Sequence, residues 1–168
     1  MLPSACTELG ITLDLLAGRP LAAFDEAESL ICACRNNEGR ECLLTPETAE
    51  AWRAMTSAAA RQGISLYIVS AYRSIARQAE LIRSKLEAGH TITDILAILA
   101  PPGFSEHHTG RAIDIGAPDC PAADPMFAET PAYAWLQGRA DEFGFTLSYP
   151  RDNSQGYVFE PWHWCYRR

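Results

Sequence analysis

Apolar positions along this chain fall into two patterns, one typical of helices and the other typical of strands. Helical spacing occurs over three stretches, at 46–62, 74–88 and 131–143. Thr45 and Thr130, each followed by Pro, stand where helices commonly begin. A shorter helix is expected from Thr93 to the Pro-Pro-Gly break that follows it. Residues 1–28 are expected to form an N-terminal lead with one or two helical turns.

Shorter apolar runs predict strands at 30–34, 42–44, 64–71, 112–116, 145–149 and 157–166, the last as one strand or two short ones. Asn-Asn-Glu-Gly at 36–39 separates the first two runs and predicts a hairpin. The run at 64–71 is apolar on both faces, which favours a central strand. Helices and antiparallel strands in mixed order predict an α+β fold with a small central antiparallel sheet flanked by helices.

A chain of 168 residues is long enough for one domain with a real core and short for two. We expect a single domain in which residues 1–44, the lead and hairpin, pack on a core of residues 45–168. The formal net charge of −7 argues against a nucleic-acid partner, because such proteins need a concentrated basic face.

No apolar run approaches the ~20 residues of a membrane-spanning helix, so no membrane span is expected. The first residues, MLPSACTELGITLDLLAG, lack the basic start and the continuous apolar stretch of a signal peptide. The sequence as written therefore indicates a cytoplasmic protein. If a signal has been removed, the protein is periplasmic or extracellular.

The chain has six cysteines but no C-x-x-C pair, so a zinc ribbon is not indicated. We expect mostly buried, reduced thiols. A bridge between Cys120 and Cys165 is an alternative, because each cysteine follows one of the two segments that carry candidate metal ligands.

The segment 105–114, Ser-Glu-His-His-Thr-Gly-Arg-Ala-Ile-Asp, holds two of the four histidines and an aspartate, a mixture that a hydrophobic core does not require. His107 and Asp114 are candidate ligands of one metal ion, because a turn at the intervening glycine would bring them together. His108 is expected to be an outer or exposed residue, since neighbouring side chains point in different directions. Asp119 is an alternative to Asp114, and a solvated pair without metal is the simplest alternative to the site.

A second segment, Glu160-Pro161-Trp162-His163, offers a third ligand and a base. Catalytic zinc sites use three protein ligands and leave the fourth position to water. His163 would complete such a set with two imidazoles and one carboxylate. Glu160 could present its carboxylate beside the metal as a general base, or it could be a surface carboxylate at a strand end. Trp162 is expected in the core or in a pocket wall.

Three blocks of the sequence resemble those of the D-alanyl-D-alanine carboxypeptidase family of zinc peptidases. The blocks are Ser-x-Tyr-Arg-Ser-x-x-x-Gln at 70–78, Ser-x-His-x-x-Gly-x-Ala-x-Asp at 105–114, and Glu-Pro-Trp-His at 160–163. They stand in family order, and the similarity spans residues 45–166. The family includes VanY-type and VanX-type enzymes and is structurally akin to the Hedgehog signalling domain, so the resemblance implies that fold.

The resemblance implies one Zn²⁺ ion held by His107, Asp114 and His163. It also implies that Glu160 is the general base and acid, and that Arg73 stabilises the oxyanion or holds a substrate carboxylate. Further substrate contacts are expected from Ser105, Gln78, Tyr72 and Trp162.

By the same resemblance, the protein is expected to hydrolyse the terminal D-Ala-D-Ala bond of peptidoglycan stem peptides or precursors, as a carboxypeptidase or dipeptidase. One alternative is a cell-wall endopeptidase or endolysin that cuts an L-Ala-D-Glu bond. Another is a catalytically silent zinc-binding module. Glu160 and Arg73 together argue against the silent module, because a structural zinc site needs neither.

Overall fold

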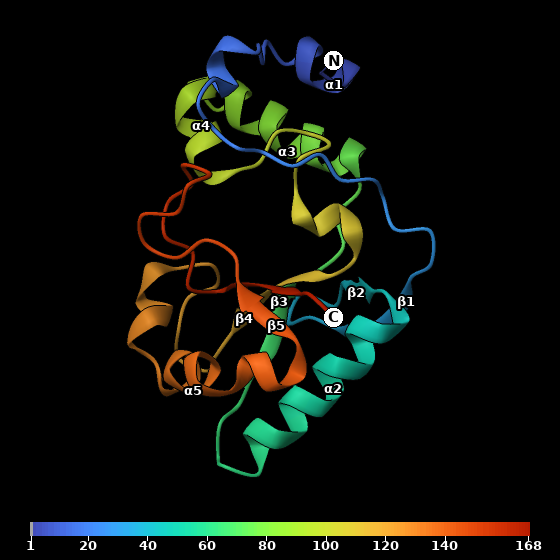
Figure 1. The fold of residues 1–168 in the computed structure, drawn as a ribbon, viewed down its shortest axis with the longest axis vertical. Helices are drawn as coiled ribbons and strands as arrows, with labels where there is room; N and C mark the ends of the chain where they lie inside the picture. The colour runs from blue at the N-terminus through green and yellow to red at the C-terminus, as the bar shows by residue number, and fades with distance from the viewer. Residues whose placement is uncertain (1) are drawn as a thin grey trace.

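The computed structural model describes residues 2–168, and its centre is a four-stranded antiparallel sheet (Figure 1). The strands lie in the order β3 (Tyr67–Ser70), β4 (Ala112–Gly116), β6 (His163–Tyr166) and β5 (Phe145–Leu147). A separate two-stranded sheet consists of β1 (Ile31–Arg35) and β2 (Glu41–Leu44), which is the predicted hairpin. Helices accompany both sheets, which confirms the predicted α+β class.

The prediction of a central strand at 64–71 is wrong, because β3 lies at an edge of the sheet and pairs with β4 alone among the described strands. The β1–β2 hairpin covers this edge. Asn36 Nδ2 donates to Val69 O at 3.2 Å, and Tyr72 N donates to Leu43 O at 3.0 Å. The apolar residues on both faces of this run therefore reflect cover by neighbouring elements.

The α-helices are α1 (Ser4–Glu8), α2 (Pro46–Ala60), α3 (Ile75–Glu87), α4 (Ile92–Ile98) and α5 (Pro131–Arg139). Helices α2 and α5 begin where the Thr-Pro pairs predict. Thr45 Oγ1 and Thr130 Oγ1 accept backbone N–H groups of the first turn at 3.3 and 3.2 Å, which satisfies amides that lack a helical partner. Helix α5 is shorter than the predicted 131–143, because the chain tightens into a 3₁₀ turn that ends at Phe143.

Helix α4 begins earlier than predicted, because Thr91 and not Thr93 is its N-cap. Thr91 Oγ1 accepts the Asp94 N–H group at 3.2 Å and donates its own hydrogen to Asp94 Oδ2 at 2.7 Å, so the Asp94 side chain fixes the hydroxyl that caps the helix. The run at 157–166 forms a strand only over its last part, β6, because its earlier residues make the turn that leads into the sheet.

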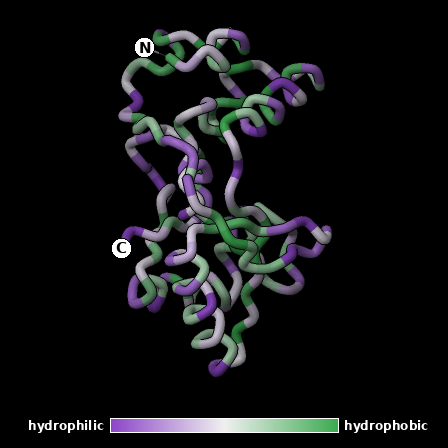
Figure 2. The backbone as a smooth tube through the Cα atoms, turned by 90° about the vertical axis from the view of Figure 1, so that its right-hand side faces the viewer, coloured by the Kyte–Doolittle hydropathy of each residue, from purple (hydrophilic) through white to green (hydrophobic). Residues whose placement is uncertain are grey.

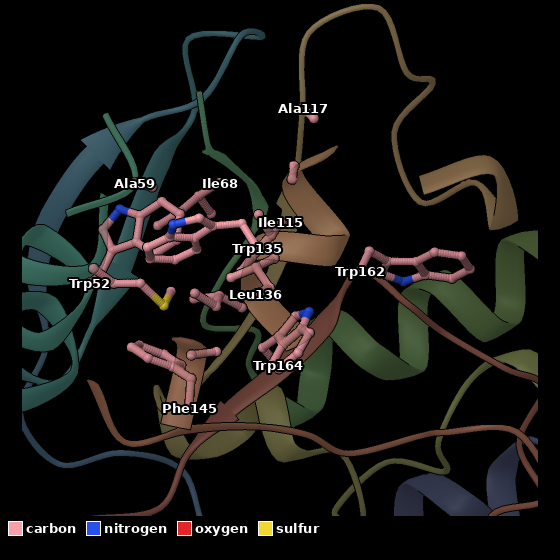
Figure 3. Packing of buried hydrophobic residues seen from close by; sticks show 14 of the residues in the cluster. Trp52, Ala59, Ile68, Ile115, Ala117, Trp135, Leu136, Phe145, Trp162 and Trp164 are labelled. Atoms are coloured by element: carbon pink, nitrogen blue, oxygen red, sulfur yellow. The ribbon is translucent and has the colours of Figure 1, made fainter. Parts of the chain in front are cut away.

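Two apolar clusters stabilise the fold. The larger cluster packs the sheet against α2 and α5, and Figure 3 shows most of its labelled side chains gathered closely, with Trp162 and Ala117 apart from the rest. The smaller cluster packs the N-terminal lead on α3 and α4 at one end of the molecule (Figure 1). Figure 2 shows hydrophobic stretches in the middle of the molecule and also at the end that carries the N-terminus.

The six cysteines are free thiols, so the Cys120–Cys165 bridge is absent. Cys6, Cys42 and Cys165 are buried, whereas Cys32 is exposed. None of the helices formed by residues 2–168 combines the length and the apolar character that crossing a membrane requires.

Candidate metal centre

The segment 105–114 folds as a tight turn followed by a buried strand. Ser105 caps the 3₁₀ turn η2 (Glu106–Thr109), and its Oγ accepts the His107 N–H group at 3.3 Å. Gly110 ends the turn with a φ of 64°, a left-handed conformation that glycine adopts without strain. The chain then enters β4, and this fold-back brings His107 Nε2 to 3.3 Å from Asp114 Oδ2.

The pairing of β4 with β6 joins the two candidate segments. Asp114 stands opposite His163 in the register, and His163 Nδ1 lies 3.0 Å from Asp114 Oδ1. The rings of His107 and His163 meet edge to face with centroids 4.9 Å apart. One potential ligand atom from each of the three residues lies within 4.8 Å of the others, and all three residues are buried.

This donor set fits a tetrahedral metal ion. Two ligand atoms about 2.1 Å from zinc at the tetrahedral angle lie about 3.4 Å apart, close to the separations found around Asp114. The hydrogen-bond partners of the two imidazole rings are also consistent with metal binding. The Ala71 carbonyl lies 2.7 Å from His107 Nδ1, and Glu106 Oε2 lies 3.0 Å from His163 Nε2. Each acceptor assigns the proton to that nitrogen and leaves the other one free to bind a metal.

Burial and neighbouring charges set the protonation of the three groups. Burial lowers the pKa of His107, which favours the neutral imidazole that a metal requires. Burial would raise the pKa of Asp114, but the two histidines outweigh it and hold the pKa well below its usual range. Burial would lower the pKa of His163, but hydrogen bonds to Asp114 and Glu106 outweigh it and raise the pKa to about 10.

Glu160 lies next to the ligand cluster without joining it. Its Oε2 is 4.0 Å from His163 Nδ1. The His163 N–H group donates to Glu160 O at 3.1 Å and closes a turn over Pro161 and Trp162, which fixes the carboxylate relative to the ligand. Burial raises the pKa of Glu160 to about 7, a value suited to a general base near neutral pH. The surface alternative for Glu160 is wrong, because the residue is only 8% exposed.

Arg73 follows β3 and is held by three contacts. Its guanidinium donates to Gln78 Oε1 at 2.8 Å and to Ser70 Oγ at 3.2 Å, and its N–H group donates to His107 O at 3.1 Å. Gln78 is fully buried and also donates through Nε2 to Ala100 O at 2.6 Å, so both ends of its amide are engaged. Gln78 therefore orients Arg73.

A pocket of about 490 Å³ opens onto this cluster. Of the residues predicted from the motifs, its walls include His107, Asp114, His163, Glu160, Arg73, Gln78, Ser105 and Trp162. Tyr72 does not line the pocket, and its hydroxyl donates to Glu26 Oε2 at 2.7 Å. Asp119 is exposed and lies outside the ligand cluster.

Two buried side chains have contacts that the motifs did not indicate. His108 is fully buried, so of its two expected places the exposed one is wrong, and the residue lies outside the ligand cluster as the other alternative has it. Its Nδ1 lies 2.6 Å from Arg73 O and its Nε2 accepts the Gly103 N–H group at 3.1 Å, which fixes the backbone around the site. Glu106 contacts His163, and the only signal for it in the sequence is its place directly before His107.

Comparisons with known proteins extend the resemblance. Residues 41–168 match the family model described as VanY, D-alanyl-D-alanine carboxypeptidase. The chain is 34% identical over 123 residues to the putative carboxypeptidase YodJ of Bacillus subtilis, covering 71% of this chain and 45% of that protein. It is 31% identical over 162 residues to the bifunctional D-Ala-D-Ala dipeptidase and carboxypeptidase VanXYC of Enterococcus gallinarum, covering 92% of this chain and 83% of that protein. The chain thus spans less than half of YodJ and most of VanXYC.

Solved structures share the fold. The LdcB LD-carboxypeptidase has a TM-score of 0.74 and 30% identity, covering 84% of this chain and 69% of LdcB. VanXYg, a D,D-dipeptidase solved with a D-Ala-D-Ala phosphinate analogue, has a TM-score of 0.71 and 27% identity, covering 91% of this chain and 62% of VanXYg. The family match over residues 41–168 and the identity to VanXYC show that the chain belongs to the VanY family of D-alanyl-D-alanine carboxypeptidases.

Proposed function

We propose that this protein is a zinc-dependent D,D-carboxypeptidase or dipeptidase that hydrolyses the terminal D-Ala-D-Ala bond of peptidoglycan stem peptides or their precursors. The observation that carries the proposal is the cluster of three buried ligand atoms beside Glu160 in the wall of the pocket. The activity named for VanXYC and the D-Ala-D-Ala analogue bound by VanXYg support the choice of substrate.

One zinc ion would be held by His107 Nε2, the Asp114 carboxylate and His163 Nδ1. Two neutral imidazoles and one carboxylate suit a catalytic zinc ion, and a VanY protein of the same fold has been solved with Zn(II). When bound, the ion would acidify a water molecule and polarise the substrate carbonyl.

The residues around the ligands would carry the proton and the developing charge. Glu160 would take a proton from the attacking water and return it to the departing amine, which its raised pKa favours. Arg73, held in place by Gln78 and Ser70, would offer fixed positive charge to the oxyanion of the tetrahedral intermediate or to a substrate carboxylate.

A second candidate is an L,D-carboxypeptidase. LdcB, which is named an LD-carboxypeptidase, supports this candidate through its TM-score of 0.74 and 30% identity. The same ligands and base would serve both reactions, because the candidates differ only in the configuration of the residue before the scissile bond. Paired peptides that end in D-Ala-D-Ala and in an L-residue followed by D-Ala separate the two by which one loses its last residue.

Replacement of the proposed base tests the function. Glu160→Gln protein should retain bound zinc in elemental analysis, because Glu160 is outside the ligand set, yet lose about 10²–10⁴-fold in kcat. Glu50→Gln, a change at an exposed carboxylate on α2, serves as the matched control and should keep full activity. Wild-type turnover by Glu160→Gln would refute the assignment of the base. Failure of zinc-loaded wild-type protein to cleave any of the peptides would refute the function.

A further inference from the structure

Glu106 is a buried carboxylate beside the candidate metal centre but outside the ligand set. It is 5% exposed. Its Oε2 lies 3.0 Å from His163 Nε2 and accepts a hydrogen bond from Ser148 Oγ at 2.6 Å. Its other oxygen, Oε1, pairs with the guanidinium of Arg167. Each carboxylate oxygen therefore has a fixed partner, and one oxygen is directed at a proposed ligand.

We propose that Glu106 is a positioning residue that holds the ring and the tautomer of His163 for metal binding. This inference rests on the metal site of the proposed function. An ionised carboxylate can only accept a hydrogen bond, so Nε2 of His163 must carry a proton toward Glu106. The remaining nitrogen, Nδ1, is the one that faces Asp114 and belongs to the ligand cluster.

The surroundings of Glu106 keep its carboxylate ionised and correctly aimed. A second buried carboxylate near Asp114 would be costly without a counter-charge, and Arg167 supplies one. Ser148 occupies another lone pair of the same oxygen that meets His163, which limits rotation of the carboxylate. The Tyr149 ring, tilted with its centroid 4.7 Å from that of His163, restricts the imidazole from one face.

The two histidine ligands are oriented by different kinds of partner. His107 Nδ1 meets the backbone carbonyl of Ala71, which no side-chain substitution removes. His163 instead meets a side-chain carboxylate, which makes the imidazole a stronger ligand than a neutral acceptor does. The β6 half of the site therefore depends on one replaceable residue, Glu106, and this dependence can be measured.

The test is zinc affinity, measured by competition with a chromophoric chelator. Glu106→Gln should weaken zinc binding about 10–100-fold, in line with the usual effect of removing an outer partner of a ligand histidine. Glu142→Gln removes an exposed carboxylate that pairs with Arg139 and should leave the affinity unchanged. The visible absorption of the cobalt(II)-loaded protein should also shift in Glu106→Gln and not in Glu142→Gln, because the ring orientation of one ligand changes.

An unchanged zinc affinity and an unchanged cobalt spectrum in Glu106→Gln would overturn the inference. If Glu106→Gln does not fold, zinc binding by Ser148→Ala is measured instead. That variant keeps the Glu106 carboxylate but removes the Ser148 hydrogen bond that limits its rotation. Weaker zinc binding by Ser148→Ala supports the positioning role, and wild-type affinity overturns it. Different results would refute the proposed function. These are wild-type protein that does not bind zinc, or His163→Ala protein that binds zinc as tightly as wild type.

Discussion

Replacement of Arg73 by glutamine should separate its role in catalysis from its role in folding. Its guanidinium is held by Gln78 and Ser70 and lines the same pocket wall as the candidate metal ligands. Loss of one preorganised donor to a developing oxyanion costs about 3–4 kcal/mol, or 10²–10³ in kcat. Loss of the bond to fully buried Gln78 leaves its Oε1 unpaired and costs about 1–3 kcal/mol, and loss of the bond to Ser70 costs about 1 kcal/mol. The sum is below the usual stability of a domain, so the variant should still fold.

The assay is release of alanine from a zinc-loaded reaction with a peptide ending in D-Ala-D-Ala, analysed for kcat and KM. A fall in kcat with little change in KM identifies Arg73 with the oxyanion, whereas a rise in KM alone identifies it with a substrate carboxylate. Arg77→Gln is the matched control, because Arg77 is exposed and pairs with Glu80 on the surface of α3. A kcat of Arg73→Gln within about threefold of wild type would refute the oxyanion role, which requires a loss of at least about 10². If KM is also within about threefold of wild type, both roles of Arg73 are refuted.

Three further predictions follow from the ligand set, the core and the thiols. His107→Ala should lose bound zinc in elemental analysis, whereas His90→Ala, a change in an exposed loop, should retain it; zinc retained by the first variant would contradict the ligand set. Ile113→Ala should lower the free energy of unfolding by about 2–5 kcal/mol in denaturant titration, because Ile113 is fully buried in β4; a loss below about 1 kcal/mol would contradict the packing. Burial raises the pKa of Cys6 to about 11, so Cys6 should resist alkylation at pH 8 in the folded protein while exposed Cys32 reacts. Mass spectrometry of the labelled peptides measures this, and equal labelling of the two thiols would contradict the burial of Cys6.

Local signals in the sequence predicted the helix starts well. A cap is made by residues three positions apart, so Thr45 and Thr130 could be assigned from their neighbours alone. The error at α4 is also local, because the capping hydroxyl of Thr91 accepts the N–H group of Asp94, three residues later, and Thr93 does not stand at that spacing.

Long-range contacts were harder to predict. The edge of the sheet at β3 is covered by the β1–β2 hairpin, which lies far earlier in the chain. The hydrogen bond from Asn36 to Val69, for example, joins residues 33 positions apart. Periodicity cannot distinguish such cover from a neighbouring strand. The prediction of a single domain with a lead and hairpin over 1–44 stays a prediction.

The residues of the candidate site also divide into those that local motifs predict and those that long-range contacts define. His107, Asp114 and His163 could be named because their motifs are compact, and the structure brings the three together. Glu106 could not be named, because its partners Ser148 and Arg167 lie 42 and 61 positions away. Only the folded sheet places those side chains around one carboxylate.

The central claim is that the two sequence segments form one metal-dependent hydrolytic site. Mass spectrometry of the products from a soluble pentapeptide ending in D-Ala-D-Ala tests it most directly, with zinc-loaded protein in the presence and absence of a chelator. The account predicts loss of one terminal alanine, abolished by the chelator and restored by added zinc. Cleavage that persists in full after the metal has been removed would contradict the account.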